Sequence, residues 1–498
     1  MRDHQPVEIT EFNGLWQRKD SAESCPIDHF VDAANLEFIE GGVETRAGIT
    51  TWTGGIGFFN ILKVKNYQKV ASESLLLLDS NGNIYDTGSP TPSTPILTIA
   101  GMLDFGFVVI NGRAYISPST KVHGMAGEFV YVYKGDGTTA RKAAGSGPTD
   151  AEGLLAAANG AAGHVQAGYH IFGIVYETDT GFFTTIGPDT LPALLCPGTA
   201  KVDLSSIPVP VSTAVVSKHI IATRAIPTTI YTGDTRGYEF FFVPDGELAV
   251  AATTATINFY DVELLDSADY LLDILSEIPA GVGLGLYRGR MTNWTQEPND
   301  EQSNVLVSTA GEPEVFDAIT GIITLQANNQ PITICFEQRE VLYIAKYSET
   351  FATQDNGDEP ANWGVPSKLD QGFGVALHGL ALSLDNGGIA ADFAIVANYS
   401  GIMIFTGTFT FPELSWKIAE LWESLEVVDF QDIECYNDTI LKRLYIILPG
   451  LQRLLVGDYQ RGIDNMKIRW IVWTANVEIT SICLTNINQL IIASNQSI

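Results

Sequence analysis

Histidines are the first side chains to consider for metal or acid-base chemistry, and the sequence holds seven of them. The pair nearest to each other, His164 and His170, lies six residues apart in or beside an Ala/Gly-rich stretch, and we do not interpret it as a metal site. The HExxH, Walker and GxSxG motifs, which would indicate metalloprotease, nucleotide-binding or hydrolase chemistry, do not occur. We therefore predict no catalytic residue, no cofactor-binding residue and no metal ligand, and a protein that is not an enzyme.

Acidic loops are the second possibility, because calcium takes oxygen ligands from Asp and Asn side chains around a glycine turn. The stretch Asp79–Asp86 has such residues around Gly82, but it lacks the bidentate Glu of an EF-hand and is flanked by expected strands. A hairpin turn is the favoured interpretation. The loop formed by Asp355, Asn356, Gly357, Asp358 and Glu359 better suits a loosely held cation, although solvated acidic loops are common.

Glycoside hydrolysis requires two carboxylates about 5 to 9.5 Å apart. With 58 acidic residues, the sequence cannot select a pair, and it has no sialidase Asp box. Aromatic side chains that could stack on sugars are more often part of a core, and this applies to Trp294, Trp363, Trp416, Trp422, Trp470 and Trp473. Because side chains alternate along a strand, Trp470 and Trp473 cannot share one face of a regular strand.

Glycines, sequons and cysteines complete the search for chemistry. Gly281–Gly285 lacks the GxGxxG spacing of a nucleotide site, so we expect a close backbone approach there. The sequons at Asn293 and Asn398 would matter only in a secreted eukaryotic protein. We expect reduced thiols, most of them buried, at Cys25, Cys196, Cys335, Cys435 and Cys483, because they are odd in number and widely spaced.

The charge balance is strongly acidic. The 498 residues include 28 Lys and Arg against 58 Asp and Glu, a formal net charge of −30, yet only 17% are charged, whereas about 25% is usual. Such a charge repels phosphate backbones and argues against tight nucleic-acid binding. The hydrophobic fraction of 45% is sufficient for a packed core, no apolar run reaches the about 20 residues of a membrane helix, and the acidic amino terminus does not resemble a secretory signal. We expect a soluble protein that folds in a cytosol.

Short alternating apolar runs separated by turn residues predict an all-β protein. In the clearest hairpin, Leu75–Asp86, the dipeptide Asn81-Gly82 predicts a two-residue type I′ turn, and Phe107–Ile116 repeats this pattern at Asn111-Gly112. Looser copies occupy residues 334–344, 393–405, 433–448 and 484–493, with turns at 338–340, 399–401, near 437–438 and at 486–488. Repetition of one small antiparallel sheet predicts a β-propeller-like main domain. A multidomain protein rich in β-sandwiches is the alternative.

One segment interrupts the repetition. Of residues 140–168, 16 of 29 are Ala or Gly, which predicts either a flexible connector or, at Asp150–Asn159, one short helix. About six strands follow and predict an inserted immunoglobulin- or fibronectin-like sandwich, at residues 169–176, 181–186, 201–204, 218–224, 238–244 and 256–260. Residues 266–278 are expected to form a short helix or turn that returns the chain to the main domain.

We thus predict a discontinuous main domain with one insertion. Its amino-terminal part covers residues 1–139 and its carboxy-terminal part residues 266–498, with the connector at 140–168 and the inserted sandwich at 165–265. Blade number cannot be counted, because no WD or kelch signature is present.

The amino-terminal region resembles the opening of tailed-bacteriophage virion proteins of the tail tubular protein B or nozzle type. The resemblance rests on the order of Phe12–Leu15, Cys25–Phe30, Ala33–Leu36 and Gly41–Ile49, with softer echoes in Asn304–Phe316 and Ile402–Gly407. The order also has a physical basis as an entry strand and turn. Asn35 can stabilise its own turn, Gly41-Gly42 permits a reversal, and Arg46 offers five donors that can hold the segment in place.

The resemblance implies a structural protein, present as a ring of often six copies at the tail or neck of the virion and made in the host cytoplasm. Its partners would be its own copies, the neighbouring tail, adaptor or neck proteins, and double-stranded DNA that passes along the axis without tight binding. Asp355, Asp358 and Glu359 would then be candidates for lumen or interface charge. Two alternatives stay open: a host-surface polysaccharide binder or hydrolase, and an extracellular propeller scaffold.

Overall fold

The protein is almost entirely β-structure. A computed structural model describes residues 13–15, 17, 30, 34–39, 42–46 and 60–494, apart from 149–152, 191, 234–236, 297–302, 327–329, 370–372, 384–392, 411–412, 427–429, 449–451, 464–466, 476 and 487–488. Strands make up 49% and helices 5%, in many small antiparallel sheets of which none is closed. The expected all-β class is confirmed.

Of the seven four-stranded sheets in the described residues, six have their strands in simple sequence order. The first contains β3 (Ile61–Gln68), β4 (Glu73–Asp79), β5 (Asn83–Asp86) and β6 (Leu97–Thr98). The second contains β7 (Asp104–Ile110), β8 (Arg113–Ser119), β9 (Tyr131–Tyr133) and β10 (Arg141–Lys142). The third contains β20 (Gly283–Tyr287), β21 (Arg290–Trp294), β22 (Asn304–Val307) and β23 (Ile322–Thr324).

The other three follow in the carboxy-terminal half. They contain β24 (Ile332–Gln338), β25 (Val341–Lys346), β26 (Thr350–Thr353) and β27 (Ser367–Lys368); β28 (Leu380–Ser383), β29 (Phe393–Asn398), β30 (Gly401–Phe405) and β31 (Phe409–Thr410); and β32 (Cys435–Asp438), β33 (Arg443–Leu448), β34 (Arg453–Asp458) and β35 (Arg469–Thr474). A two-stranded sheet of β36 (Ile479–Leu484) and β37 (Leu490–Ser494) follows.

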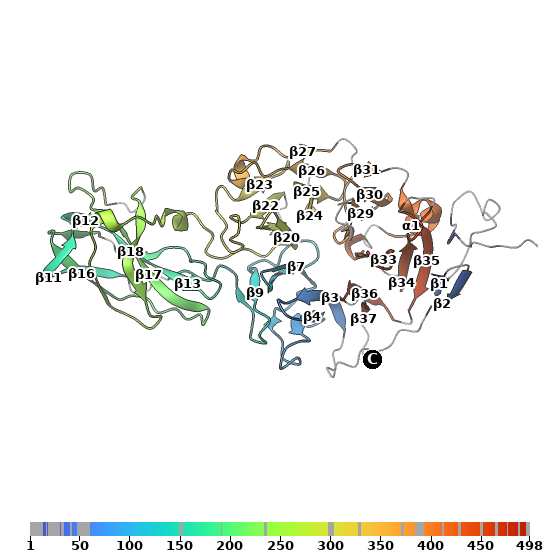
Figure 1. The fold of residues 1–498 in the computed structure, drawn as a ribbon, viewed down its shortest axis with the longest axis horizontal. Coiled ribbons are helices and arrows are strands. Elements are labelled where there is room, and N and C mark those ends of the chain that lie inside the picture. The colour runs from blue at the N-terminus through green and yellow to red at the C-terminus, as the bar shows by residue number, and fades with distance from the viewer. Residues whose placement is uncertain are drawn as a thin grey trace, which may run out of the picture.

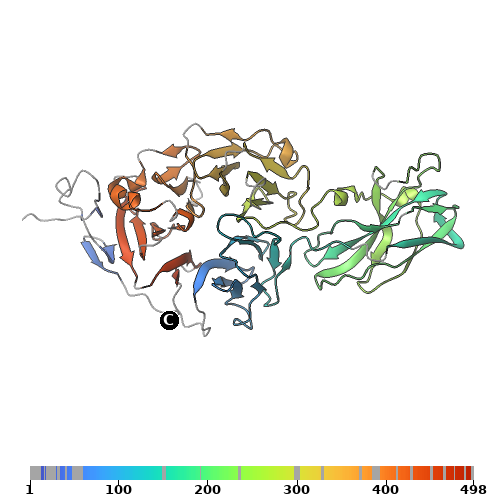
Figure 2. The same cartoon turned by 180° about the vertical axis from the view of Figure 1, so that it is seen from behind.

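These sheets form the body of the molecule, and consecutive sheets lie side by side around a common centre (Figures 1 and 2). Apolar clusters fill the spaces between neighbours. One cluster, for example, joins Tyr115 and Val132 of the second sheet to Leu284 and Met291 of the third. Where the series ends, β36 packs against β3, but the two strands share no sheet. Side chains make this seam instead, since Ser481 Oγ accepts from the Val64 amide at 3.2 Å and Thr480 Oγ1 donates to the Ile61 carbonyl at 2.6 Å.

The turns confirm most of the hairpin predictions and correct two. Between Ile110 and Arg113, Asn111 and Gly112 both have positive φ, 52° and 75°, as a type I′ turn requires. In the Leu75–Asp86 hairpin only Gly82 has positive φ, so the expected type I′ turn is wrong. Asp79 accepts from the amides of Asn81 and Asn83, each at 2.9 Å, and this holds a three-residue loop. The turn expected near residues 437–438 lies after β32, at residues 439–442.

Residues 154–264 form a separate arm with its own apolar core. Its sheets contain β11 (Leu155–Val165), β16 (Ala200–Ser205) and β19 (Ala255–Ile257); β14 (Gly187–Asp189), β13 (Phe172–Thr178), β17 (Val215–Thr223) and β18 (Phe240–Leu248); and β12 (Gly168–His170) with β15 (Leu194–Cys196). The arm projects from one side of the body (Figure 1). The connector is not merely a linker: residues 149–152 lie outside the described residues, but Leu155–Val165 pair with β16, and neither a helix nor a free coil is present there. The strand expected at 181–186 is displaced to Gly187–Asp189.

Helical residues are few. Among the described residues they include η2 (Asp261–Glu263), η3 (Asp269–Leu272), η4 (Pro360–Asn362), η5 (Leu414–Ile418) and α1 (Ala419–Glu423). The 3₁₀ helix η3 lies where the sequence predicts a short helix or turn between residues 266 and 278. Among the described residues, no helix has the length and apolar character needed to span a bilayer.

An amino-terminal segment covers β35, the outer strand of the sixth sheet. The Leu15 amide donates to the Trp470 carbonyl, and the Asn35 amide to the Val472 carbonyl, both at 2.9 Å. Asn35 also exchanges side-chain hydrogen bonds with Thr474, and Arg46 donates to Asn35 Oδ1 and lies over the Trp473 ring. β1 (Leu36–Ile39) and β2 (Gly42–Thr45) form a hairpin beside this contact. Cys25–His29 and Ala47–Ile49, which carry part of the resemblance, lie outside the described residues.

Candidate functional site

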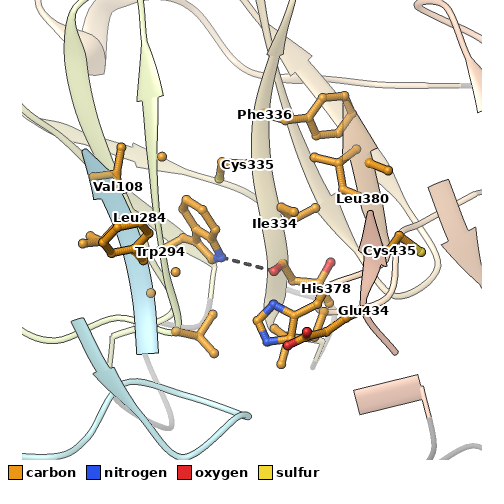
Figure 3. Close-up of a pocket in the computed structure, with 18 of the residues that line it drawn as sticks. Val108, Leu284, Trp294, Ile334, Cys335, Phe336, His378, Leu380, Glu434 and Cys435 are labelled. Carbon is orange, nitrogen blue, oxygen red and sulfur yellow. Dashed lines mark hydrogen bonds between the residues drawn. The ribbon is translucent and has the colours of Figure 1, made fainter. Parts of the chain in front are cut away.

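The first strands of the six four-stranded sheets converge on a central cavity of about 550 Å³. Its walls are largely apolar and aromatic, and include Phe105, Leu284, Trp294 and Phe336. Figure 3 shows His378 and Glu434 close together at one end of this cavity, away from Phe336. The cavity is therefore a mostly apolar space with a polar end.

Glycines allow the second and third sheets to approach closely at this cavity. A Cβ at Gly106 would lie 2.8 Å from Gly283 Cα, and a Cβ at Gly283 would lie 2.1 Å from the Trp294 ring. The Trp294 Nε1 donates to the Thr333 carbonyl at 3.2 Å (Figure 3). The close backbone approach expected at Gly281–Gly285 is confirmed.

His378 and Glu434 at the polar end belong to a buried ionic cluster, which lies where the first and last sheets meet. Lys63 Nζ lies 2.6 Å from Glu434 Oε1 and 3.6 Å from Asp104 Oδ2, and His378 Nε2 contacts the same Asp104 oxygen. Ser481 Oγ donates to Glu434 Oε2 at 2.8 Å. Each side chain comes from a different sheet or from the loop before it, so the cluster joins the two ends of the series of sheets.

Mutual attraction keeps this cluster charged despite its burial. Burial disfavours the ammonium of Lys63, but Asp104 and Glu434 outweigh it and raise the pKa of Lys63 above its usual range. Burial likewise opposes the carboxylate of Glu434, yet Lys63, Lys65 and His378 lower its pKa to about 2. The pKa of Asp104 is lowered too, because Lys63 and His378 outweigh its desolvation. A general acid needs a pKa near the working pH, so Glu434 is poorly suited to that role.

The two cavity thiols are equally poor candidates for a nucleophile. Burial raises the pKa of the Cys335 thiol well above its ordinary value, and it also raises the pKa of the Cys435 thiol. Because the thiolate is the reactive form, both side chains behave as small apolar groups. Cys196, Cys335, Cys435 and Cys483 are buried free thiols, as expected, and Cys25 lies outside the described residues.

A Ser-His-Glu group in the arm resembles a hydrolase triad only in composition. Ser217 Oγ donates to Glu177 Oε2 at 2.6 Å, and His219 Nε2 contacts both that oxygen, at 3.0 Å, and Ser217 Oγ, at 2.9 Å. A triad requires the acid to orient one ring nitrogen while the other accepts the serine proton. Here one nitrogen faces both partners, and the serine is bonded to the carboxylate. The hydrogen bond from Ser217 is the main reason that the pKa of Glu177 is lowered.

A second charged network fixes the arm to the body. Arg141 donates to Asp179 Oδ1 from both Nε and Nη2, at 2.8 and 2.7 Å, and from Nη1 to Glu314 Oε2 at 3.2 Å. Asp179 belongs to the arm, whereas Glu314 lies in the connection between β22 and β23 of the body and is buried. The Tyr115 hydroxyl and the Ala144 amide also donate to Glu314. This planar, multidentate contact restrains the orientation of the arm.

Replacing Arg141 by alanine is expected to loosen the arm, because Glu314 then loses its cationic partner and Asp179 its bidentate one. Small-angle X-ray scattering of the wild-type chain should fit one rigid shape, whereas the variant should require a mixture of arm orientations. Lys201→Ala, a substitution of a cation within β16, serves as the matched control and should scatter like the wild type. A variant that scatters like the wild type would show that Arg141 does not hold the arm.

The structure separates most of the side chains that the sequence singles out. Asp355 Oδ2 pairs with Arg290 Nε at 3.1 Å in the loop before η4 and does not line the cavity, while Asp358 and Glu359 are exposed. His164 stacks on Tyr260, and buried His170 bonds two backbone carbonyls. No three His, Cys, Asp or Glu side chains in the described part of the chain are placed to share a metal ion.

The tryptophans and sequons lie mostly inside. Trp294, Trp363, Trp422, Trp470 and Trp473 are buried, and Trp416 is half-buried. Trp470 and Trp473 belong to different apolar clusters, which confirms that they lie on opposite faces. Asn293 and Asn398 are buried as well, so neither sequon is accessible to glycosylation.

Sequence reasoning missed the cluster of Lys63, Asp104, His378 and Glu434. Lys63 and Glu434 lie 371 residues apart, and no motif connects them. The local signals are weak: Asp104 opens β7 ahead of mostly apolar residues, and Lys63 lies within β3, where it is followed by the apolar Val64. Neither signal identifies a partner.

Comparisons with known proteins do not identify a family. No family model and no curated protein matches the sequence. Among solved structures, the chain is similar to a computationally designed protein, Ika8, with 8% identity, 88% of this chain and 94% of that chain covered, and a TM-score of 0.34. It is also similar to Hsv2 of Kluyvelomyces marxianus, with 9% identity, 60% of this chain and 70% of that chain covered, and a TM-score of 0.27. The corresponding values for BBS1N in complex with ARL6DN are 9% identity, 89% and 91% coverage, and a TM-score of 0.28. These values are too low to assign a fold or a function to this chain.

Proposed function

We propose that this chain is a structural component of a tailed-phage virion that assembles as a ring at the tail or neck, through which DNA is ejected. The observation that carries the proposal is the projecting arm, a second apolar core fixed to the body by Arg141. A rigid arm gives each copy two separated surfaces with which to contact neighbours. The ionic side chains described above serve cohesion rather than turnover, which agrees with a protein that acts by shape.

We further propose that the body is a β-propeller of seven blades, with β36 and β37 as an incomplete seventh blade, and that the arm is an inserted immunoglobulin- or fibronectin-like sandwich. The radial order of the sheets supports the first assignment, and two sheets around one core support the second. Three of the described residues that belong to the resemblance, Gly14, Asn35 and Arg46, contact β35. Their order in the sequence thus has a structural purpose in this chain.

The DNA path would run between copies rather than through the body. A cavity of about 550 Å³ that is lined by inner strands has no room for a duplex. Residues 165–265 carry four Lys or Arg against ten Asp or Glu, a net charge of −6 in 101 residues, and the remaining 397 residues carry −24. The mean charge per residue is about the same in both parts, so a ring could turn an acidic surface of either part toward the duplex. Such a surface repels phosphates and lets DNA slide past.

The test is the assembly state of the purified chain. Multi-angle light scattering and negative-stain electron microscopy should show closed rings, expected to contain six copies, with an open centre. Duplex DNA should show no measurable binding at physiological salt. A chain that remains monomeric, or that is absent from purified virions by mass spectrometry, would refute the proposal. The polysaccharide alternative would instead require binding to host glycans, and the buried tryptophans offer such ligands little stacking surface.

A further inference from the structure

The outer edges of the sheets differ sharply in how they are protected. Unpaired strand edges recruit other strands, and proteins protect them with short strands, charges, proline or a covering segment. Five of the six four-stranded sheets of the body end in strands of two or three residues, namely β6, β10, β23, β27 and β31. The sixth ends in β35, and the amino-terminal segment covers it.

In the arm, three edges are protected in the same ways. β14 and β19 are three residues long. β18 has nine residues, but it contains Pro244, Asp245 and Glu247, and residues 266–268 exchange backbone hydrogen bonds with Phe240 and Phe242. These features leave little of the three edges available to another strand.

The edge strand β11 has register shifts that mark β-bulges after Ala158, but its first four residues, Leu155–Ala158, lack such protection. It is 11 residues long and contains no charged residue and no proline. Leu155–Ala158 pair in regular register with β16 on one side, and no backbone hydrogen bond of these four residues on the other side occurs among the described contacts. The Leu155 side chain is 59% exposed, and the small alanines beside it allow another backbone to come close.

The position of β11 favours a second copy of this chain as the occupant. Two copies that each carry −30 repel each other, so they associate best where charge is absent and their acidic bodies are far apart. β11 meets both conditions, because it is uncharged and lies at the end of the arm that is farthest from the body (Figures 1 and 2). Screening at physiological salt extends over about 8 Å, so bodies separated by the arm contribute little repulsion.

We propose that the free edge of β11 at Leu155–Ala158 is a contact between copies, where an extended segment of the adjacent copy adds to the sheet β11-β16-β19. This inference rests on the proposed ring and names the surface that builds it. Main-chain hydrogen bonds supply affinity in such strand addition, and the apolar Leu155 side chain adds buried area.

The test uses the full-length chain with Leu155→Lys and Ala157→Lys together. Both side chains are exposed, so the variant should keep the wild-type melting temperature. Lysine on an edge strand blocks strand addition, although two positive charges reduce the overall repulsion between copies. Sedimentation velocity over a dilution series should show association weakened by about tenfold or more. Ala251→Lys, at an exposed turn of the same arm, is the matched control and should associate like the wild type.

The outcomes separate the two proposals. If the double variant assembles as well as the wild type or better, the edge inference fails while the ring survives. If the wild-type chain is monomeric throughout the series, both fail. Hydrogen exchange supplies a second readout, since the amides of Leu155–Ala158 that face away from β16 should slow on assembly. Unchanged exchange there in assembled protein would place the contact elsewhere.

Discussion

Replacing Glu434 by glutamine is expected to lower the free energy of unfolding by about 3 to 5 kcal/mol at neutral pH, because removal of one partner leaves the buried charge of Lys63 poorly compensated. Of its two described ion-pair partners, Lys63 would lose Glu434, at 2.6 Å, and keep Asp104, at 3.6 Å. Urea denaturation followed by tryptophan fluorescence measures the loss. The matched control is Glu359→Gln, which removes an exposed carboxylate and should change stability by less than about 0.5 kcal/mol.

The difference in the free energy of unfolding between the wild type and Glu434→Gln is expected to depend on pH. The pKa of Glu434 is lowered from 4.5 to about 2 in the folded chain, so its charge stabilises the fold fully above about pH 4.5, and the contribution is lost as the pH falls through about 2. Wild type and Glu434→Gln should therefore differ most at neutral pH and converge in acid. A difference that stays constant down to pH 2 would show that the glutamine acts through packing and not through charge.

Replacing Trp470 by alanine is expected to cost about 3 to 5 kcal/mol, the range for removal of a large buried aromatic side chain. Trp470 is fully buried in β35, and its Nε1 donates to the Leu414 carbonyl at 2.9 Å. The amino-terminal segment also packs here, since a Cβ at Gly14 would lie 2.7 Å from the Trp470 amide nitrogen. Thermal unfolding measures the loss, and limited proteolysis should release the amino-terminal segment early.

Trp416→Ala is the comparison for this variant, because Trp416 is only half-buried in η5. Its loss should cost about 1 to 2 kcal/mol and leave the amino-terminal segment resistant to protease. If the two tryptophan variants were equally stable, Trp470 would not be the centre of this core.

Local sequence patterns predicted the elements well, because the residues within a hairpin specify its turn and its two strands. Asn111-Gly112 specifies its turn through two positive φ values, and Gly283 marks the close approach of two strands. Failures occurred where distant residues override local ones. The alanines of β11 favour helix or coil in isolation, yet pairing with β16 and burial of Val165 against the arm core make them a strand.

The buried cluster could not be predicted for a related reason. Lysine and glutamate in a strand ordinarily indicate a solvent-facing side. Lys63 of the first sheet and Glu434, just before the sixth, are buried where distant sheets meet, and that contact depends on the whole series of sheets rather than on any local pattern.

The seam between β3 and β36 also constrains the order in which the protein is completed. Val64 is synthesised 417 residues before Ser481. Because β3 and β36 share no sheet, the contact between them depends on side chains that are not present until the end of synthesis. The arm, by contrast, has all of its strands once residue 257 has left the ribosome, and chains fold largely from the amino terminus as they are made. In a nascent chain, the arm therefore has all of its strands before the body does. The last strands to emerge, β36 and β37, complete the contact of the body with β3.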